Sequence, residues 1–302
     1  MYEKTLKYDA RVDSAQPPGL FAGLSTVDLG YRVNEIPGPN QKVSTAAPLV
    51  AAGGPATNAA ITFAFLGGKS TLITAVGGHA LGAVIRQDLE HFGVSLHDIA
   101  AGQTAMPAVS SILVLPNGER SVVSANAKAF PELKIEIDRE WLDGARFVLI
   151  DGHYPALCNT VASEARAAGL DVILDAGSWK EGMDALLSKA TVALCSHDFR
   201  PPGCASSDDV FQRVVDGGVA RVAITRGAES ILYRGDAKCG EVAVENVQAV
   251  DTTGAGDVFH GAFCYRFSLV RDFADALNFA AKIATFSCGH LGTRSWMEAF
   301  RE

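Results

Sequence analysis

The stretch 251-DTTGAGDVFHGAF-263 places two threonines, a Gly-Ala-Gly turn and an aspartate directly before an apolar run. Gly254 and Gly256 carry no Cβ, so the backbone can turn tightly there and a ligand can approach it closely. The apolar residues that follow recur at helical spacing, which predicts a helix that begins near Asp257. Because the N-terminus of a helix presents N–H groups and a partial positive charge, the stretch predicts an anion site.

Asp257 has two interpretations on physical grounds alone. It is either a first-turn residue that complements the helix dipole or a chemical group beside a bound ligand. The two glycines next to it favour the second interpretation, because they allow close approach of a ligand. His260 lies one turn further along, and we expect it to pack beside the site without acting in it.

The composition narrows the class of protein. The 302 residues are 48% hydrophobic, which allows one large domain or two modest ones. Lys and Arg number 26 against 34 Asp and Glu, without a basic cluster, so we expect no nucleic-acid partner. No apolar run is long enough to span a membrane, and the N-terminus lacks the apolar core of a signal peptide. The six cysteines include no C-x-x-C pair, so disulfides are not expected and the interpretation is a cytoplasmic protein.

The chain from about residue 145 onward alternates apolar strands with short helices, which predicts a mostly parallel sheet covered by helices on both faces. The fold class is therefore α/β. A first strand is expected over Leu20–Leu24, and 53-GGPATNAAITFAFLGG-68 predicts a Gly-Gly turn that leads into a helix. Further strands are expected over 71–76, 147–151, 172–175, 192–195 and 222–225, a hairpin near 230–247, and helices over 81–92, 156–168 and from about 257 to 288.

Two segments have a sequence pattern that is typical of β-strands and differs from the rest of the chain. Residues 107–125 alternate apolar and polar side chains around 116-PNG-118, which predicts a hairpin. Residues 29–50 are extended and partly polar. We expect both to pair into a small lid sheet inserted in a single domain over 19–302, after a flexible tail over 1–18.

Three common motifs are excluded. The segment 68-GKS-70 lacks the earlier glycine of a P-loop, because position 63 is Phe. The glycines at 254 and 256 lack the third glycine of a dinucleotide fingerprint, because position 259 is Phe. A G-x-S-x-G nucleophile motif is absent.

The motifs that remain resemble those of the ribokinase-like sugar kinases, the PfkB family. The stretch 251-DTTGAGD-257 resembles the family signature. Asp28 after the first strand, 53-GGPATN-58 and 225-TRG-227 resemble its other elements in order and spacing. The resemblance covers residues from about 20 to 295 and implies a ribokinase-like fold.

The resemblance implies ATP-dependent phosphorylation of a sugar hydroxymethyl group. Asp257 would be the general base for the substrate hydroxyl. The N–H groups from Thr253 through Gly254, Ala255 and Gly256 to Asp257 would form an anion hole for the γ-phosphate. Mg²⁺ would bridge the phosphates, since phosphoryl transfer depends on positioning and charge neutralisation.

Other residues follow from the same resemblance. Asp28, Gly54 and Asn58 would bind the sugar, while Thr225 and Gly227 would face the nucleotide. Arg120, after the predicted hairpin, is either an arginine that reaches the nucleotide phosphates or an exposed surface residue. K⁺ would bind beside the anion hole, and the residues implied are Asp251, Thr253, Cys288 and Gly292.

Three positions depart from the family pattern. His79 stands where a carboxylate is common, and Pro55 stands where the family has a sugar contact. The Asn-x-x-Glu motif that organises Mg²⁺ is replaced by Ser196 and Phe199, which leaves Asp198 as a candidate. The magnesium network is therefore expected to differ in detail.

The segments 195-CSHDF-199 and 288-CGHLGTRSW-296 resemble the ketohexokinase and sulfofructose kinase branch, which favours a ketose or fructose-like substrate. Arg32, Lys42 and Arg86 are candidate cations for a substrate anion, or else surface charges. A nucleoside kinase and a catalytically weak sugar-sensing binder remain alternatives. A homodimer paired through the lid strands is expected, because exposed strand edges favour such pairing.

Overall fold

The computed structural model describes residues 16–301 apart from 131, 132 and 134. The expected tail over 1–18 lies outside the described residues except for its last three positions. Pro18, the last of them, is already the first residue of a strand. None of the helices in the described part of the chain is long and apolar enough to cross a bilayer.

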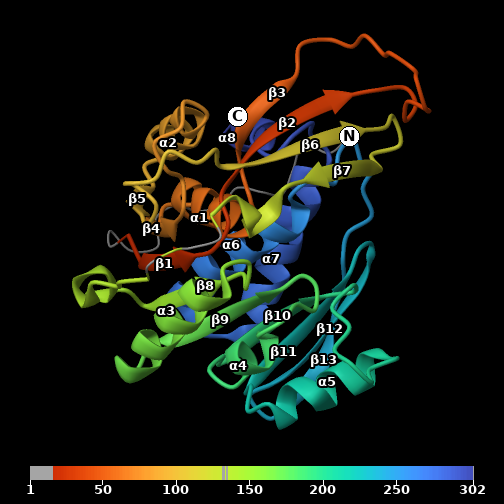
Figure 1. The fold of residues 1–302 in the computed structure, drawn as a ribbon. Helices are drawn as coiled ribbons and strands as arrows, with labels where there is room; N and C mark the ends of the chain where they lie inside the picture. The colour runs from red at the N-terminus through yellow and green to blue at the C-terminus, as the bar shows by residue number, and fades with distance from the viewer. Residues whose placement is uncertain (1–15, 131–132, 134, 302) are drawn as a thin grey trace.

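The described residues form two sheets, and the larger one runs through the middle of the molecule (Figure 1). All neighbouring strands of the larger sheet are parallel except at one edge, where the last two strands form the antiparallel hairpin expected near 230–247. This arrangement confirms the α/β class. Across the sheet the order is β13 (Lys238–Val242), β12 (Glu229–Gly235), β11 (Arg221–Arg226), β10 (Val192–Ser196), β9 (Asp171–Ala176), β8 (Phe147–Ile150), β1 (Pro18–Ala22), β4 (Lys69–Thr74) and β5 (Ser95–Asp98).

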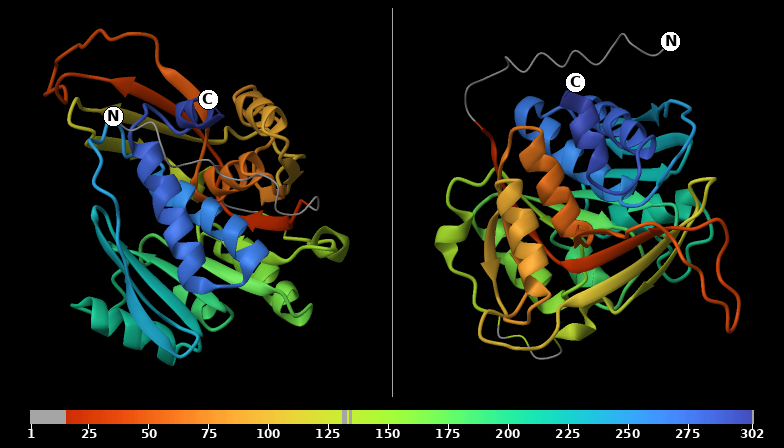
Figure 2. Two further views of the ribbon diagram at one scale, coloured as in Figure 1. Left: turned by 180° about the vertical axis from the view of Figure 1, so that it is seen from behind. Right: turned by 90° about the horizontal axis from the view of Figure 1, so that it is seen from above.

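Helices cover both faces of the large sheet, as Figure 2 shows from behind and from above. One apolar core lies under α1 (Pro55–Phe65), α2 (Gly82–His91), α6 (Ala255–Val270), α7 (Phe273–Cys288) and α8 (Ser295–Arg301). A second core lies under α3 (Pro155–Ala167), α4 (Met183–Leu187) and α5 (Ser207–Asp216). Single-turn helices η1 (Asn126–Ala129) and η2 (Arg139–Leu142) precede β8 in the chain. The alternation of side chains along each buried strand supplies both cores at once.

The smaller sheet lies above the large one in Figure 1 and has the order β3 (Leu49–Gly53), β2 (Thr26–Arg32), β6 (Ala108–Val114) and β7 (Arg120–Ser124). The expected segments 29–50 and 107–125 do supply these strands, but β2 begins earlier and β3 ends later. β2 pairs with β6 in parallel, so two segments far apart in sequence form the centre of this sheet. The first strand also ends at Ala22, two residues before the expected end.

One consequence is a correction for Asp28. The sequence placed Asp28 directly after the first strand, whereas Asp28 is the third residue of β2 in the smaller sheet. The chain leaves β1 at Ala22 and re-enters regular structure at Thr26, so the polar run that looked like a strand end is the crossing between the sheets. Asp28 therefore belongs to the smaller sheet, where it lies opposite Ala51 of β3 and Ser110 of β6.

Two glycines let the first turns of α1 and α6 pack closely against their neighbours. Gly54 has φ +94°, and a Cβ there would lie 2.3 Å from the Leu24 carbonyl oxygen. A Cβ on Gly261 would lie 2.4 Å from the Ala59 carbonyl oxygen, so α6 packs on α1 at backbone distance. Only glycine permits both approaches without displacement of backbone. The two helix starts consequently meet beside the carboxyl ends of the parallel strands, which is where α/β proteins bind ligands.

Candidate active site

The glycine stretch forms the first turn of α6. Gly254 is the N-cap with φ +70°, Ala255 and Gly256 follow, and Asp257 is the third helical residue. Gly254, as the N-cap, has no side chain with which to cap this turn. A Cβ built on Gly256 would meet nothing within 4 Å, so the backbone there borders open space. The backbone at Gly256 is thus accessible at a helix N-terminus, which is where the sequence predicts an anion site.

The loop that precedes α6 is tied down by Asp251. Its two carboxylate oxygens accept N–H groups from Thr253 and Gly292, each at 2.8 Å. The Cys288 carbonyl oxygen in turn accepts the N–H groups of Val250 and Asp251. The Thr253 N–H is therefore already bonded to protein, and this part of the predicted anion hole is corrected. The Ala255 N–H also donates to protein, to the Thr252 carbonyl oxygen at 3.3 Å, so Gly254, Gly256 and Asp257 supply the other N–H groups of the turn.

The four residues implied for a monovalent cation are brought together by these same bonds. Asp251, Thr253, Cys288 and Gly292 all lie where the α6 loop meets the end of α7. The Thr253 Oγ1 atom is buried and has no hydrogen-bond partner among the described residues. An orphaned buried oxygen of this kind is consistent with an oxygen ligand for a cation.

Arg120 comes from β7 of the smaller sheet and reaches the glycine loop. Its Nη1 donates to Thr252 Oγ1 at 2.6 Å, and that hydroxyl donates to the Gly118 carbonyl oxygen at 3.2 Å. The hairpin of the smaller sheet thus touches the segment that leads into α6. Arg120 is exposed and lies beside the segment that leads into α6, so both of its interpretations stay open.

Asn58 and Asp257 are joined directly. The Asn58 Nδ2 donates to Asp257 Oδ2 at 2.8 Å, although 199 residues separate them in sequence. The Asn58 Oδ1 accepts from Arg294 Nη1 at 3.0 Å, which fixes which end of the amide faces the carboxylate. Asn58 is 3% exposed, so its polar atoms are occupied by protein partners. A contact of Asn58 with sugar hydroxyls would therefore have to form in addition to these two hydrogen bonds.

Arg294 was not singled out by the sequence. Its Nη2 donates to the Ala52 carbonyl oxygen at 2.7 Å and pairs with Asp88 of α2 at 3.2 Å. Burial lowers the pKa of Arg294, and the carboxylates of Asp88 and Asp28 oppose that effect. No local pattern marks this arginine, because its partners lie over 200 residues away.

Asp28 faces the same region from β2. Its Oδ1 accepts from Thr26 Oγ1 at 2.5 Å. Burial raises the pKa of Asp28, and hydrogen bonds from Thr26 and Ser110 oppose the rise. A Cβ on Gly53 would lie 1.9 Å from Asp28 Oδ2, so the glycine pair of the sequence motif makes room for this carboxylate.

Asp257 is half-buried beside two further ionisable groups, Asp175 at the end of β9 and His260 on α6. One ligand atom from each of the three residues lies within 4.8 Å of the other two. Burial and the neighbouring Asp175 carboxylate raise the pKa of Asp257 to about 7, against the opposing effect of Asn58 and His260. A carboxylate with a pKa near neutrality can both accept and release a proton at working pH. Asp175 and Asp257 are also oxygen donors of the kind that Mg²⁺ takes.

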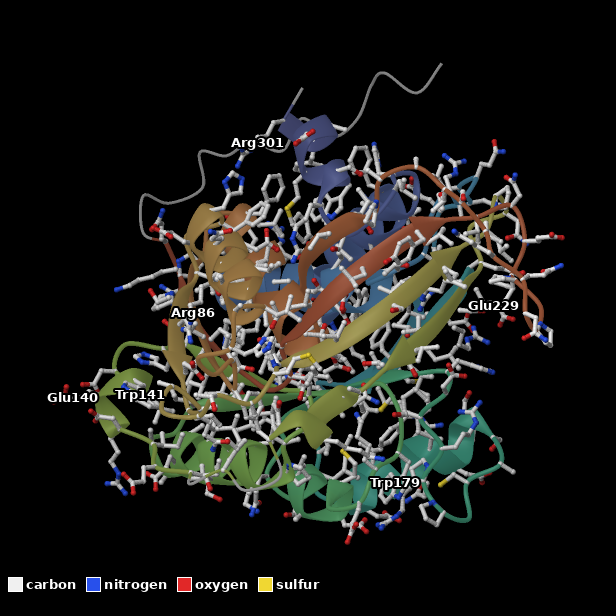
Figure 3. The ribbon with its side chains drawn as sticks, turned by 45° about the horizontal axis from the view of Figure 1, so that its top comes forward. Arg86, Glu140, Trp141, Trp179, Glu229 and Arg301 are labelled. Atoms are coloured by element: carbon white, nitrogen blue, oxygen red, sulfur yellow. The ribbon has the colours of Figure 1, made fainter. Side chains whose placement is uncertain are left out.

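The predicted nucleotide residues lie at the end of β11. Thr225 Oγ1 is 3.4 Å from the Cys195 carbonyl oxygen, and Gly227 has open space where a Cβ would stand. In the segment that replaces the family's Asn-x-x-Glu motif, Phe199 is fully buried. It packs against Trp179, which is labelled in Figure 3, with ring centroids 5.6 Å apart. An acid in place of Phe199 would therefore enter an apolar core. Asp198 next to it is exposed.

Arg86 and Asp151 both have their polar atoms bonded to other parts of the protein near the site. Arg86, on α2 and labelled in Figure 3, is paired with Asp98 at 2.6 Å and donates to the Gly77 carbonyl oxygen, so it is committed to the protein. Asp151, directly after β8, accepts N–H groups from Leu24 and Ala56 and was not foreseen as part of the site. A carboxylate at the end of an apolar strand was the available signal for both Asp151 and Asp175.

A helix N-terminus at the carboxyl edge of a parallel sheet, with a carboxylate beside it, is an arrangement that phosphoryl transfer can use. The chain belongs to the pfkB family of carbohydrate kinases, whose model matches residues 20–299. It is accordingly an ATP-dependent sugar kinase with a ribokinase-like fold, and sugar and ATP are its substrates.

Among similar proteins, the ribokinase of Arabidopsis thaliana is 27% identical over 296 residues, which cover 91% of this chain and 76% of that protein. The deoxyribokinase of Salmonella typhi is 27% identical, covering 90% of this chain and 93% of that one. The crystal structure of a ribokinase candidate from Agrobacterium tumefaciens superposes with a TM-score of 0.85 at 26% identity, over 95% of this chain and 98% of that one. A fructokinase from Xylella fastidiosa with bound ATP has the same fold, with a TM-score of 0.72, 20% identity and coverage of 94% and 99%.

Proposed function

We propose that the chain transfers the γ-phosphate of ATP to a primary hydroxyl of a small sugar that forms a furanose ring. A fructose-like ketose is the first candidate, on the resemblance of 195-CSHDF-199 and 288-CGHLGTRSW-296 to ketose kinases. Ribose is the second candidate, because the similar proteins include ribokinases. The single observation that carries the proposal is the pairing of a free helix N-terminus with Asp257, whose pKa is about 7.

In the proposed reaction Asp257 accepts the proton of the sugar hydroxyl. The hydroxyl oxygen forms a bond to the γ-phosphorus, and the bond from that phosphorus to the bridging oxygen of ATP breaks, so ADP leaves. The N–H groups at Gly254, Ala255 and Gly256 stabilise the negative charge on the transferred group. Arg120 adds a positive charge from the side of the smaller sheet, and Thr225 with Gly227 faces the rest of the nucleotide.

Asp28, Gly54 and Asn58 are proposed to hold the sugar. Asp28 offers carboxylate oxygens from β2, and Asn58 keeps its amide oriented through Arg294. Bound Mg²⁺ supplies neutralisation of the phosphate charge in such reactions. Asp198 and Asp175 are the carboxylates that would hold it, in place of the usual acid at Phe199. K⁺ is proposed at Asp251, Thr253, Cys288 and Gly292, on the strength of the orphaned Thr253 hydroxyl.

Residues 19–302 are proposed to act as one kinase domain, with the smaller sheet as a lid. The outer strands β3 and β7 form the edges of this sheet. Its surface carries exposed apolar side chains at Leu49, Val50, Val122 and Val123, the last 77% exposed. We propose that two copies pair through this surface, since exposed strands with apolar side chains favour association. A monomeric mass in solution would remove the dimer from the proposal.

The test is a coupled ADP-release assay with Mg-ATP and K⁺ across ketoses, aldoses, sugar phosphates and nucleosides. Turnover on fructose or another ketose supports the first candidate, and turnover on ribose alone selects the second. The Asp257→Asn variant measured in parallel gives the background of the assay. Preference for a nucleoside, or ATP binding without turnover of any sugar, would overturn the proposal.

A further inference from the structure

Arg294 lies just before α8, and its side chain joins three other parts of the chain. The guanidinium group donates to the Asn58 Oδ1 atom of α1 at 3.0 Å, to the Ala52 carbonyl oxygen of β3 at 2.7 Å and to the Asp88 carboxylate of α2 at 3.2 Å. The ring centroid of Phe92, at the end of α2, lies 5.6 Å from the guanidinium carbon. The side chains of Arg294 and Asp88 are 17% and 18% exposed, so both are largely enclosed by protein.

The N–H and the C=O of Ala52 are both bonded by this pair. β3 is an edge strand of the smaller sheet, and an edge strand presents N–H and C=O groups that no neighbouring strand pairs. The Ala52 N–H donates to Asp88 Oδ2 at 3.0 Å, while the Ala52 carbonyl oxygen accepts from Arg294. Because Arg294 also bonds the same Asp88 oxygen, the three groups form a closed ring. Asp88 and Arg294 therefore fix the end of β3 from the side of α2.

The end of β3 leads directly into the residues proposed to bind the sugar. Ala52 precedes Gly53, and a Cβ on Gly53 would lie 1.9 Å from Oδ2 of Asp28. A shift of the backbone at Ala52 would therefore change the space beside the Asp28 carboxylate. On α1, the Asn58 amide is oriented by the hydrogen bond from the arginine. One ion pair thus holds two parts of the proposed sugar site that come from different elements.

Asp88 is outside the group of residues proposed to touch sugar or ATP. It lies on α2 and reaches the site through Arg294 and Ala52. A largely buried guanidinium group needs a carboxylate partner, because an unpaired buried charge is costly. Its planar fork can bond Asn58 and Ala52 at the same time, which a lysine ammonium cannot do with the same geometry. Arg294 held by Asp88 is therefore a rigid link between the end of β3 and α1.

We propose that Asp88 and Arg294 act as one positioning unit for the sugar substrate, which keeps the end of β3 and the Asn58 amide at the spacing that the sugar requires. Both are positioning residues, because they act through Ala52 and Asn58 and do not need to touch the sugar. The inference rests on the proposed function, since it takes Asn58 and Asp28 as sugar contacts. The unit should control sugar binding and leave ATP binding at α6 unchanged.

The experiment compares Asp88→Asn, Arg294→Lys and the double variant with the wild type in steady-state kinetics on the best sugar. Asp88→Asn keeps the size of the side chain and one acceptor oxygen but removes its charge. Each single variant should raise KM for the sugar about tenfold, the scale of hydrogen bonds to a charged group, with a smaller change in kcat and an unchanged KM for ATP. The double variant should have a sugar KM no higher than that of the more affected single variant, because residues that act as one unit are not additive.

The Asn58 side-chain amide provides a readout that does not depend on turnover. Its ¹H–¹⁵N NMR signals, assigned with Asn58→Ala, should shift in all three variants, because each of them changes the hydrogen bond from position 294 to the amide oxygen. Unshifted Asn58 signals in Asp88→Asn would show that Asp88 does not act on this side chain, and they would overturn the inference.

Asp171→Asn is the matched control. Asp171 is also a half-buried carboxylate paired with an arginine, Arg271 at 2.6 Å, but it lies at the first residue of β9, at the amino edge of the sheet. Its replacement should leave the sugar KM and the Asn58 signals unchanged, even where its Tm falls as far as that of Asp88→Asn. This comparison separates positioning from a general loss of stability.

Three kinetic results would overturn the inference. They are an unchanged sugar KM in Asp88→Asn, an equal rise of KM for sugar and ATP, and a double variant whose sugar KM rises by the product of the two single effects. If no sugar is phosphorylated by the wild type, the proposed function fails, while the Asn58 signals still decide whether Asp88 and Arg294 hold that amide together.

Discussion

The first turns of α1 and α6 begin alike and end differently. Both helices start at a glycine with positive φ, +94° at Gly54 and +70° at Gly254, and neither has a side-chain cap from its own first residue. At α1 the first turn is closed by protein, because Asp151 accepts the Ala56 N–H at 3.2 Å. At α6 the backbone at Gly256 borders open space.

The same sequence pattern, a glycine at the start of a helix, therefore has different consequences at α1 and at α6. A glycine start at the carboxyl edge of a parallel sheet predicts a ligand site in both places. At α1 the buried Asp151 carboxylate already accepts the Ala56 N–H, so that helix start offers a ligand mainly the backbone at Gly54 and side chains such as Asn58. At α6 the N-terminus itself is available to a phosphate. Local sequence shows where the helix starts lie, and the tertiary structure decides what each of them can bind.

The largest effect should follow from removing the Asp257 carboxylate at the first turn of α6, called the open turn because the backbone at Gly256 borders open space. Asp257→Asn should lower kcat by about 10²-fold or more, the usual scale for loss of a general base. ATP binding should remain, since the backbone N–H groups are unchanged. Steady-state kinetics with calorimetric ATP titration checks both parts. Turnover within a few-fold of wild type would break the assignment of the base to α6.

The next effect tests the two glycine starts against each other. Gly54→Ala should lower the unfolding free energy by about 2 kcal/mol or more, because the new Cβ meets the Leu24 backbone and φ is positive. Gly256→Ala has space and a helical position, so its Tm should be unchanged or higher. Its kcat/KM for ATP should nevertheless fall about tenfold, since a methyl group enters the phosphate space.

Thermal unfolding and ATP kinetics on both alanine variants provide the measurement. The comparison holds only if stability falls at position 54 and activity falls at position 256 without loss of stability. If Gly256→Ala binds and turns over ATP normally, the α6 turn is not where the phosphate lies.

A smaller effect is expected at the carboxylate that closes α1. Asp151→Asn leaves one oxygen to accept N–H groups that two oxygens now accept from Leu24, Ala56 and His153. The unfolding free energy should fall by about 2 kcal/mol, the scale for buried hydrogen bonds to a charged group. Asp208→Asn, at an exposed pair with Arg234, is the matched control and should cost less than about 1 kcal/mol. Equal losses in chemical denaturation would show that Asp151 does not cap α1.

Arg294 links the two helix starts, because it fixes the Asn58 amide that donates to Asp257. Arg294→Lys keeps the charge but loses the forked contact with Asn58 and Ala52. We expect KM for the sugar to rise about tenfold with a smaller change in kcat, on the scale of one or two hydrogen bonds. An unchanged KM would mean that the amide keeps its orientation without the arginine.

The sequence allowed the α/β class, most strands of the large sheet and the start of α6 to be predicted, because each depends on residues close together in the chain. Apolar runs of strand length between helical segments were sufficient from Phe147 onward. The start of β2 was missed because Ser25 and Thr26 read as the end of a strand, whereas the chain crosses there to the smaller sheet.

The rest of the site could not be predicted, for one physical reason. Asn58 and Arg294 are 236 residues apart, and the Arg294 contact with Asp88 spans 206. Such pairs leave no periodic or local trace in a single sequence. His260 could be noted from the sequence, but its contact with Asp175 could not, because the fold of the sheet brings the two residues together.

The last prediction concerns stability at the first turn of α6 itself, measured without ligand. The pKa of Asp257 is about 7 in the folded chain, above its ordinary value of 3.8, so the unfolded chain ionises this group at lower pH than the folded chain does. Its ionisation therefore opposes folding, with a penalty that is absent below the ordinary value, grows as pH rises and is complete above about 7. Asp257→Asn removes the penalty. Its Tm should exceed that of the wild type by a few degrees at pH 8 and by less at pH 5, whereas Asp208→Asn should show no such trend. A constant Tm difference between Asp257→Asn and wild type across this range would mean that folding does not disfavour ionisation of Asp257. The first turn of α6 would then carry no cost in stability for its carboxylate, and in this respect it would not differ from the first turn of α1.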